Sequence, residues 1–411
     1  MKTLSKSRFV SGVQCEKKLW YSYYRKDLQL PTDEQTQAIF DLGHQIGNLA
    51  QNRFPNGKDA TPEDFSDFSP SIEKTKLWIA EEVETIYEAT FTAKNALCML
   101  DILHRMNDEI WAIEVKNSTS VKDYHLTDAS LQYFVMKEAG YAPDKFFLMH
   151  INNQYIKNGE LTDEFFHLED ITDKVLSKQT WVEENLERLL VMLENKQEPN
   201  VSIGAHCSSP FACDFVHHCW KHIPENSVFE LYRGGNKAWE LYKQGILKIE
   251  DIEDDFPLTH FQHLQRKGLR NQEQYINKEA IKNMISSWQF PLYFFDFETV
   301  FPAIPVLDGT RPYQQVPFQY SLHILEEDGK LSHKEFLAHP EDFSNGKNPL
   351  KLLVEQLKQD FGTDGNIVTY NQSFEVARLN ELANMFPEDA PFLKNLVSRV
   401  VDLLPVFQGG F

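Results

Sequence analysis

The sequence predicts a mixed α/β (α+β) protein with more than one domain. Short apolar runs alternate with longer segments of helical periodicity, which is typical of sheets covered by helices. The chain has 411 residues, which is longer than a single hydrophobic core usually supports, so more than one domain is expected. Between the two strand-containing regions, residues 226–288 are helical in pattern and mixed in charge. We therefore predict domains at 1–225 and 289–411, joined by a helical bridge at 226–288.

The first region combines helices with at least three strands. Apolar residues at helical spacing predict helices at 36–54, 72–88, 126–139 and 180–195. Two apolar runs, 96–104 and 110–116, are joined by the turn-like sequence MNDE and predict a hairpin. The segment KFFLMHI (145–151) predicts a further strand, because aromatic and apolar residues favour strands.

The last region begins with the strand-like sequence PLYFFDFETV, which starts just after Pro291. FQYSLHIL and HKEFLA predict a hairpin around EEDGK. A helix at 349–360, a strand at NIVTYN and a helix at 373–385 follow. This alternation predicts a second sheet with covering helices.

Charge and hydropathy limit the classes of protein. The net charge of −20 argues against a passive nucleic-acid coat, since phosphate binding favours basic surfaces. Local basic strips are still possible grips for nucleic acid, with solvated surface as the alternative; they comprise Lys17, Lys18, Arg25 and Lys26, and Arg266, Lys267 and Arg270. No apolar run reaches the length of a membrane helix, and the basic N-terminus has no apolar signal core. We therefore expect a cytoplasmic protein without a membrane partner.

Asp101, Glu114 and Lys116 interrupt two otherwise apolar strands. Side chains two residues apart on a strand share a face, so Glu114 and Lys116 are neighbours. In a hairpin, Asp101 lies beside Glu114, and with the Val115 carbonyl the carboxylates offer oxygen ligands to Mg²⁺ or Mn²⁺. A bound metal lowers the pKa of its water, and Lys116 can stabilise charge on a phosphate. The alternative is a hairpin whose charged residues face solvent.

Four of the five cysteines lie where a metal could join them. Cys15 is far upstream, whereas Cys207, Cys213 and Cys219 follow one another at a C-x5-C-x5-C spacing. Four thiolates can bind a [4Fe–4S] cluster or a Zn²⁺ ion. Zinc bound by the three clustered cysteines and a histidine, or no metal at all, are the alternatives; the histidines are His217, His218 and His222. Cys98, within ALCML, is expected in a core.

A third group of polar residues lies in the last region. Asp296 and Glu298 share one face of the strand YFFDFET, and two acids on a buried strand are costly unless a cation lies between them. Asn371 and Glu375 are four residues apart, which aligns them on a helical turn. Asp402 follows in the apolar run VVDLLPVF.

The first region resembles the PD-(D/E)xK nucleases, and among them the RecB-like exonucleases with an iron–sulfur cluster, including CRISPR-associated ones. The resemblance lies in LSKSRFVSGVQCEKKLWY, EVK, DASLQYFV and the triple-cysteine segment. It implies that His44, Asp101 and Glu114 bind metal, that Lys116 is catalytic and that Gln132 supports it. It also implies that the four cysteines ligate a [4Fe–4S] cluster. Met136 stands where that group has Tyr, and Tyr133 is displaced; His44 is otherwise a structural or exposed residue.

The last region resembles the DEDD exonucleases of the ribonuclease H-like fold, which implies that Asp296, Glu298 and Glu375 bind metal. Glu375 stands where that family has Asp. The family's last motif, a His or Tyr shortly before a final Asp, is expected after Asp402 and does not fit before Phe411. We therefore expect a truncated domain or an incomplete, inactive one.

The whole arrangement resembles an uncharacterised bacterial family that fuses the two domains. Together these features predict a metal-dependent nuclease, most simply a DNA exonuclease acting on single strands or ends. One alternative is a nucleic-acid-binding or complex-assembly protein with degenerate nuclease domains. The other is RNA processing by the last domain. The sequence identifies no protein partner.

Overall fold

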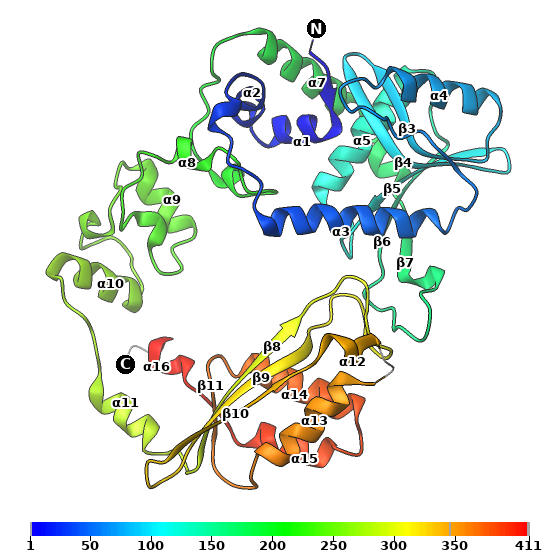
Figure 1. The fold of residues 1–411 in the computed structure, drawn as a ribbon. Helices are drawn as coiled ribbons and strands as arrows, with labels where there is room; N and C mark the ends of the chain where they lie inside the picture. Colours follow the sequence, from blue (N-terminus) through cyan, green and yellow to red (C-terminus); the bar gives the residue numbers. More distant parts are fainter. Residues whose placement is uncertain (1, 345–346, 409–411) are drawn as a thin grey trace. The chain divides into compact units, whose positions relative to one another are not determined.

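The computed structural model describes residues 2–344 and 347–408, and the chain divides into two compact units. Unit 1 consists of Met1–Asn153 and Thr162–Ile223, and unit 2 of Gln154–Leu161 and Pro224–Phe411. Each unit contains a sheet with helices (Figure 1), so the prediction of a mixed α/β protein is confirmed. The helical segment after Ile223 groups with unit 2.

The sheet of unit 1 has the strand order β2-β3-β4-β5-β6-β7, with β1 pairing to β4. Its strands are β1 (Leu4–Ser5), β2 (Lys58–Asp59), β3 (Thr85–Ala93), β4 (Ala96–Met106), β5 (Glu109–Lys116), β6 (Lys145–Ile151) and β7 (Phe166–Asp170). Strands β3, β4 and β5 are successive antiparallel neighbours, β6 is parallel to β5, and β7 is antiparallel to β6. The predicted hairpin and the predicted strand at 145–151 are confirmed.

Helix α5 connects β5 to β6, and such a crossover is what allows these two strands to run parallel. The helices of unit 1 are α1 (Lys6–Gln14), α2 (Glu16–Tyr24), α3 (Glu34–Gln51), α4 (Ser69–Ala80), α5 (Asp123–Glu138), α6 (Thr172–Leu176), α7 (Gln179–Glu194) and α8 (Val216–Cys219). Leu131 and Val135 of α5 are buried in one core cluster with Ala112 of β5 and Leu186 of α7. The core therefore lies between one face of the sheet and α5.

The prediction of a single helix at 72–88 is wrong, because α4 ends at Ala80 and β3 begins at Thr85. Glu82 has a left-handed backbone with φ of 55°, and the N–H of Val83 donates to the carbonyl of Trp78. This is the Schellman arrangement that ends helices, usually with glycine at the left-handed position. Because glutamate occupies that position, the sequence carries no glycine signal for the helix end.

The sheet of unit 2 has the order β10-β9-β8-β11-β12. Its strands are β8 (Leu292–Val300), β9 (Val316–Leu325), β10 (Leu331–Leu337), β11 (Ile367–Thr369) and β12 (Val400–Asp402). Strands β8, β9 and β10 are antiparallel neighbours, whereas β11 is parallel to both β8 and β12. The predicted hairpin of β9 and β10 is confirmed, and β11 is shorter than the predicted strand because Asn371 has a φ of 69°.

One face of this sheet is covered by helices (Figure 1). The helices of unit 2 are α9 (Asn236–Lys243), α10 (His260–Asn271), α11 (Lys278–Ile285), α12 (Pro340–Ser344), α13 (Pro349–Asp360), α14 (Ser373–Met385), α15 (Ala390–Ser398) and α16 (Leu404–Gln408). Phe295 of β8 is buried with Leu353 of α13 and Leu379 of α14. Between Pro224 and α10, a small separate core contains Val228, Leu231, Leu241, Ile249 and Ile252.

Gly365, just before β11, has a φ of 87°, and a Cβ there would overlap the carbonyl oxygen of Pro291. Gly329, in the β9–β10 turn, has a similar φ of 85° but open space around the Cβ position. We predict that Gly365→Ala lowers the free energy of unfolding by more than about 2 kcal/mol, and Gly329→Ala by about 1 kcal/mol. Urea denaturation measures both. Equal losses for the two variants would contradict the assigned close approach.

Candidate functional site

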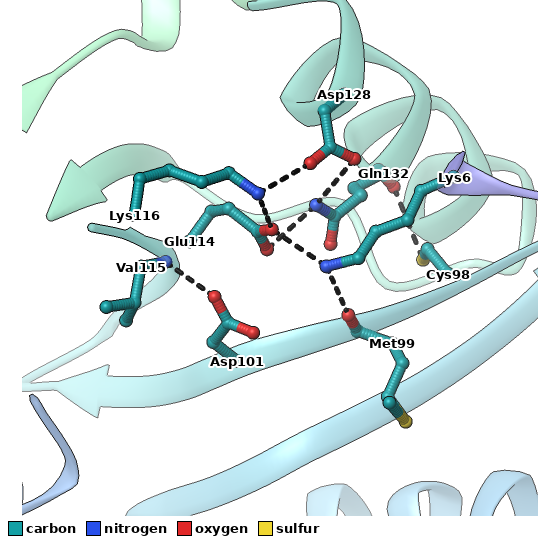
Figure 2. A network of polar contacts seen from close by, with 9 residues as sticks. All are labelled: Lys6, Cys98, Met99, Asp101, Glu114, Val115, Lys116, Asp128 and Gln132. Atoms are coloured by element: carbon teal, nitrogen blue, oxygen red, sulfur yellow. Dashed lines mark hydrogen bonds and ion pairs between the residues drawn. The ribbon is translucent and has the colours of Figure 1, made fainter. Parts of the chain in front are cut away.

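Glu114 is the centre of a buried polar network in unit 1 (Figure 2). Its side chain is 1% exposed, and Lys6 Nζ lies 2.7 Å and Lys116 Nζ 2.6 Å from Oε1. Gln132 Nε2 donates to the other oxygen, Oε2, at 2.8 Å. Burial acts to raise the pKa of Glu114, but the two ammonium groups outweigh it, so the pKa lies well below its usual range. Glu114 is therefore an ionised, buried carboxylate.

Three elements hold this network together. Strand β5 places Glu114 and Lys116 on one face, because they are two residues apart. Helix α5 contributes Asp128 and Gln132, which are one turn apart on a common face. Lys116 Nζ donates to Asp128 Oδ2 at 2.8 Å as well as to Glu114. The third element is α1, whose first residue is Lys6.

Asp101 approaches the same place from β4. Its Oδ2 accepts a 2.6 Å hydrogen bond from the N–H of Val115, which fixes the carboxyl group beside β5 (Figure 2). Burial, together with the negative charge of Glu114, raises the pKa of Asp101 to about 6. Glu114 thus stays ionised, whereas the neighbouring carboxyl group of Asp101 is more readily protonated. A cation beside both would favour ionisation of Asp101.

Glu88 is a third acidic residue at this site. Tyr87 pairs with Ile102 and Ala89 with Leu100, which places Glu88 of β3 opposite Asp101. Burial and the charge of Asp101 raise the pKa of Glu88 to about 8. Its φ of 53° is unusual for a residue within a strand.

The structure brings together four of the residues predicted for this site: Asp101, Glu114, Lys116 and Gln132. His44 lies exposed on α3, and no hydrogen bond or ion pair in the described part of the chain joins it to Asp101 or Glu114. Its role as a ligand stays a prediction. Tyr133 is half-buried against the core, and Cys98 is fully buried, as predicted.

Sequence reasoning missed three residues of the network: Lys6, Asp128 and Glu88. Asp128 precedes Gln132 by four residues, so the helix period alone could have indicated it. Lys6 is separated from Glu114 by more than a hundred residues, and its contact depends on the docking of α1. Glu88 was hidden by the helix predicted at 72–88.

The donor set fits a hard divalent cation. The carboxyl groups of Asp101 and Glu114 lie on adjacent strands and influence each other's charge, and carboxylate oxygens are the ligands that Mg²⁺ and Mn²⁺ prefer. Gln132 Oε1 is buried there and has no hydrogen-bond partner among the described protein atoms, so the site has capacity for a further polar group. Lys6 and Lys116 supply donors for the oxygens of an anionic ligand.

The four predicted cysteines line one pocket of unit 1. Cys15 lies at the junction of α1 and α2, and the other three lie in the segment that ends with α8. Four apolar residues line the same pocket, namely Val201, Ile203, Phe215 and Val216. One histidine, His206, also lines it. Burial raises the pKa of Cys15 and raises that of Cys213 to about 11.

The pocket fits a group that is bound by thiolates. All five cysteines are free, so the four lining thiols are open to a common ligand. Lys18 is buried beside the pocket and Lys17 pairs with Glu198. Arg266 and Arg270 donate to backbone carbonyls of residues 250–253. These four basic residues of the predicted strips are therefore buried or bonded within the protein.

In unit 2, Asp296 and Glu298 are exposed, so the expectation of two acids on a buried strand is wrong. The alternation of β8 puts Phe295 and Phe297 in the core and the acids on the other face. Glu375, the first acidic residue of α14, is only 2% exposed. Burial and the nearby charges of Asp296 and Asp402 raise the pKa of Glu375 to about 7.

Asp402 also belongs to this group, although no ligand role was predicted for it. Its Oδ1 accepts 2.9 Å hydrogen bonds from the N–H groups of Asn371 and Leu404. Glu375 Oε2 and Thr369 Oγ1 are buried without a partner among the described protein atoms. The unsatisfied Glu375 oxygen, close to two further carboxylates, fits a cation.

Comparison with known proteins matches residues 293–411, which are part of unit 2, to a family described as a domain of unknown function, DUF2779. An uncharacterised protein of Mycoplasma genitalium is 29% identical over 120 residues, covering 28% of this chain and 18% of that protein. Its Mycoplasma pneumoniae homologue is 32% identical over 121 residues, with the same coverage. This chain thus spans about a fifth of the length of these curated relatives.

Among solved structures, one titled "Crystal structure of SSO0001" is 15% identical and covers 53% of this chain and 86% of its own. Its TM-score is 0.29, so the likeness supports no argument about this protein. Among the helices that the structure describes, none is sufficiently long and apolar to cross a bilayer.

The raised pKa of Glu375 predicts a pH-dependent stability. The unfolded carboxyl group loses its proton near its ordinary pKa of 4.5, whereas the folded one keeps it up to about pH 7. Stability from this group is therefore complete below pH 4.5 and is lost as the pH rises through 7. We predict that Glu375→Gln gains on the order of 1–3 kcal/mol relative to the parent above that pH, in metal-free buffer.

Urea denaturation from about pH 4.5 to about pH 8 measures this difference. The matched control is Glu355→Gln, which changes an exposed carboxyl group on α13. A constant difference between Glu375→Gln and the parent over this range would contradict the assigned electrostatics.

Proposed function

We propose that this chain is a metal-dependent nuclease, most simply a DNA exonuclease that acts on single strands or ends. The observation that carries the proposal is the convergence of Asp101, Glu114, Lys116 and Gln132 from two strands and a helix (Figure 2). Hydrolysis of a phosphodiester needs stabilised negative charge and an activated water, and this group of residues offers both functions.

The two carboxyl groups are the proposed ligands of Mg²⁺ or Mn²⁺. Bound there, the metal would supply a water of lowered pKa and a Lewis acid for the phosphate. The Val115 N–H fixes the carboxyl group of Asp101, and Gln132 fixes that of Glu114. Both carboxyl groups are therefore oriented before any ligand binds. Such preorganisation is what electrostatic catalysis requires.

Lys116 is the proposed catalytic lysine. It lies between Glu114 and Asp128, and burial lowers its pKa less than these two carboxylates raise it. It therefore stays an ammonium ion, suited to orient a water or to stabilise charge on a phosphate oxygen rather than to act as a base. Asp128 keeps Lys116 at the site.

The topology also supports the proposal. An antiparallel β3–β4–β5 meander, followed by α5 and a parallel β6, presents the acidic residues on adjacent strands and Gln132 on the crossover helix. This order accords with the resemblance of the sequence to PD-(D/E)xK nucleases. DNA as the substrate, the preference for ends, and a ribonuclease H-like assignment of unit 2 rest on resemblance.

We predict that Glu114→Gln and Lys116→Ala each lower Mg²⁺- or Mn²⁺-dependent degradation of end-labelled DNA by at least about 100-fold, because the first weakens a proposed metal ligand and the second removes the ammonium ion that stabilises charge on the phosphate. Lys137→Ala, on the exposed face of the same helix as Asp128, should digest DNA at the parental rate. Circular dichroism verifies that all variants are folded.

Parental digestion by the folded Glu114→Gln and Lys116→Ala variants would refute this assignment. DNA binding without turnover in the parent would instead favour the binding or assembly protein. Degradation of RNA that persists in Lys116→Ala but is lost in Asp296→Ala would favour RNA processing by unit 2, where the resemblance implies Asp296, Glu298 and Glu375 as metal ligands and Asp402 lies near Glu375.

The cysteine pocket is proposed to hold a [4Fe–4S] cluster that joins the N-terminal helices to the segment containing α8. Thiolates bound to iron need a reducing compartment during assembly, which accords with a cytoplasmic location. We predict that anaerobically purified protein is brown and that Cys213→Ala is colourless, whereas Cys98→Ala keeps its colour. Visible absorption and iron content measure this. Colourless parent protein with stoichiometric zinc lost in Cys213→Ala would contradict the cluster.

A further inference from the structure

Two histidines and a glutamate form a separate group on β6 and β7 of unit 1. His150 of β6 pairs directly with His167 of β7, and Leu148 pairs with Glu169. His167 and Glu169 are two residues apart, so they project from the same face as His150. The group is defined by the pairing of two strands and not by sequence proximity.

The three side chains bring their ligand atoms together. One atom from each of His150, His167 and Glu169 lies within 4.8 Å of the others. His150 Nε2 is 3.8 Å from Glu169 Oε2, and the imidazole ring centroids are 5.1 Å apart. At 3.8 Å the His150–Glu169 contact is too long for a direct hydrogen bond. Within the described residues this is the one such group of histidine, cysteine and acidic side chains.

Neighbouring contacts orient two of the ligands. His150 Nδ1 lies 3.1 Å from the carbonyl oxygen of Ile151, which can only accept, so Nδ1 carries the hydrogen. In the tautomer with its hydrogen on Nδ1, Nε2 carries the lone pair that a metal can bind, and Nε2 faces Glu169. Lys174 Nζ binds Glu169 Oε1 at 2.9 Å and leaves Oε2 toward the histidines. Second contacts of this kind are typical of metal-binding histidines and carboxylates.

We propose that His150, His167 and Glu169 bind one divalent transition-metal ion of the Zn²⁺ class. Two imidazoles and a carboxylate are a known three-residue ligand set for zinc, which completes its coordination with water. Zinc ligands at about 2.0–2.1 Å lie about 3.3 Å apart around a tetrahedral ion, so small side-chain rotations suffice. The His150 side chain is 8% exposed and forms the base of the site, whereas exposed His167 gives the ion access.

This site differs in chemistry from the proposed nuclease site. Imidazole nitrogen favours zinc-like ions, while the oxygen set of Asp101 and Glu114 favours Mg²⁺ or Mn²⁺. His150 is the strand partner of Lys116, one strand further along the same sheet. The inference stands on the β6–β7 geometry alone, and it holds whether or not the chain cleaves nucleic acid.

The test is the binding of Zn²⁺ to the full chain after removal of metal with a chelator, measured by calorimetry and by metal content after dialysis. His167→Ala removes an exposed ligand without opening the core, and Glu169→Gln preserves the shape of the ligand while removing its charge. Each should lose one Zn²⁺ per chain relative to the parent, or weaken that binding by more than about 100-fold, since even outer partners of ligands are worth 10–100-fold.

Three controls separate this site from others in the chain. His260→Ala removes an exposed histidine of unit 2 and should retain the parental stoichiometry. Glu114→Gln should also retain this Zn²⁺, even if it abolishes nuclease activity, and a large excess of Mg²⁺ should not displace the ion. Unchanged Zn²⁺ binding in both His167→Ala and Glu169→Gln would overturn the proposal, as would its displacement by equimolar Mg²⁺.

Discussion

The buried carboxylate of Glu114 and its two lysine partners are the interaction on which unit 1 depends. An ionised carboxylate that is 1% exposed is costly without compensation, and Lys6, Lys116 and Gln132 together satisfy its oxygens. These partners come from α1, β5 and α5, so one charge couples the N-terminal helix to the sheet and to the crossover helix. Removing one partner of such a buried pair typically costs about 3–5 kcal/mol. The network is therefore structural as well as a candidate for chemistry.

The same network gives the site its electrostatic character. Lys6 and Lys116 keep Glu114 ionised, whereas burial and the charge of Glu114 disfavour ionisation of Asp101. Burial and the charge of Asp101 disfavour ionisation of Glu88 more strongly. Four acidic groups, Glu88, Asp101, Glu114 and Asp128, thus share two ammonium ions. A divalent cation at Asp101 and Glu114 would relieve the repulsion among the acids and would compete with Lys6 for Oε1 of Glu114. In unit 2, the carboxyl group of Glu375 is likewise buried near other negative charges, those of Asp296 and Asp402.

Local sequence patterns predicted the parts of the fold that depend on local periodicity. The alternation in β5 was sufficient to place Glu114 and Lys116 on one face, and the apolar run of β6 identified that strand. The end of α4 was missed because Glu82, not glycine, adopts the left-handed conformation there. The exposure of Asp296 was missed because apolar residues on both sides of an acid resemble a strand covered on two faces. Lys6 could not be found, since its contact arises only when α1 docks on the sheet.

The cluster of His150, His167 and Glu169 illustrates the same limit, because the residues become neighbours through strand pairing between β6 and β7.

The most direct test of the central claim is a crystal structure of the parent protein soaked with Mn²⁺, with anomalous scattering to locate the ion. The account predicts an ion about 2 Å from oxygens of both Asp101 and Glu114, with Lys6 Nζ moved away from Glu114 Oε1. An unchanged lysine pair on Glu114, with no Mn²⁺ beside Asp101, would contradict it.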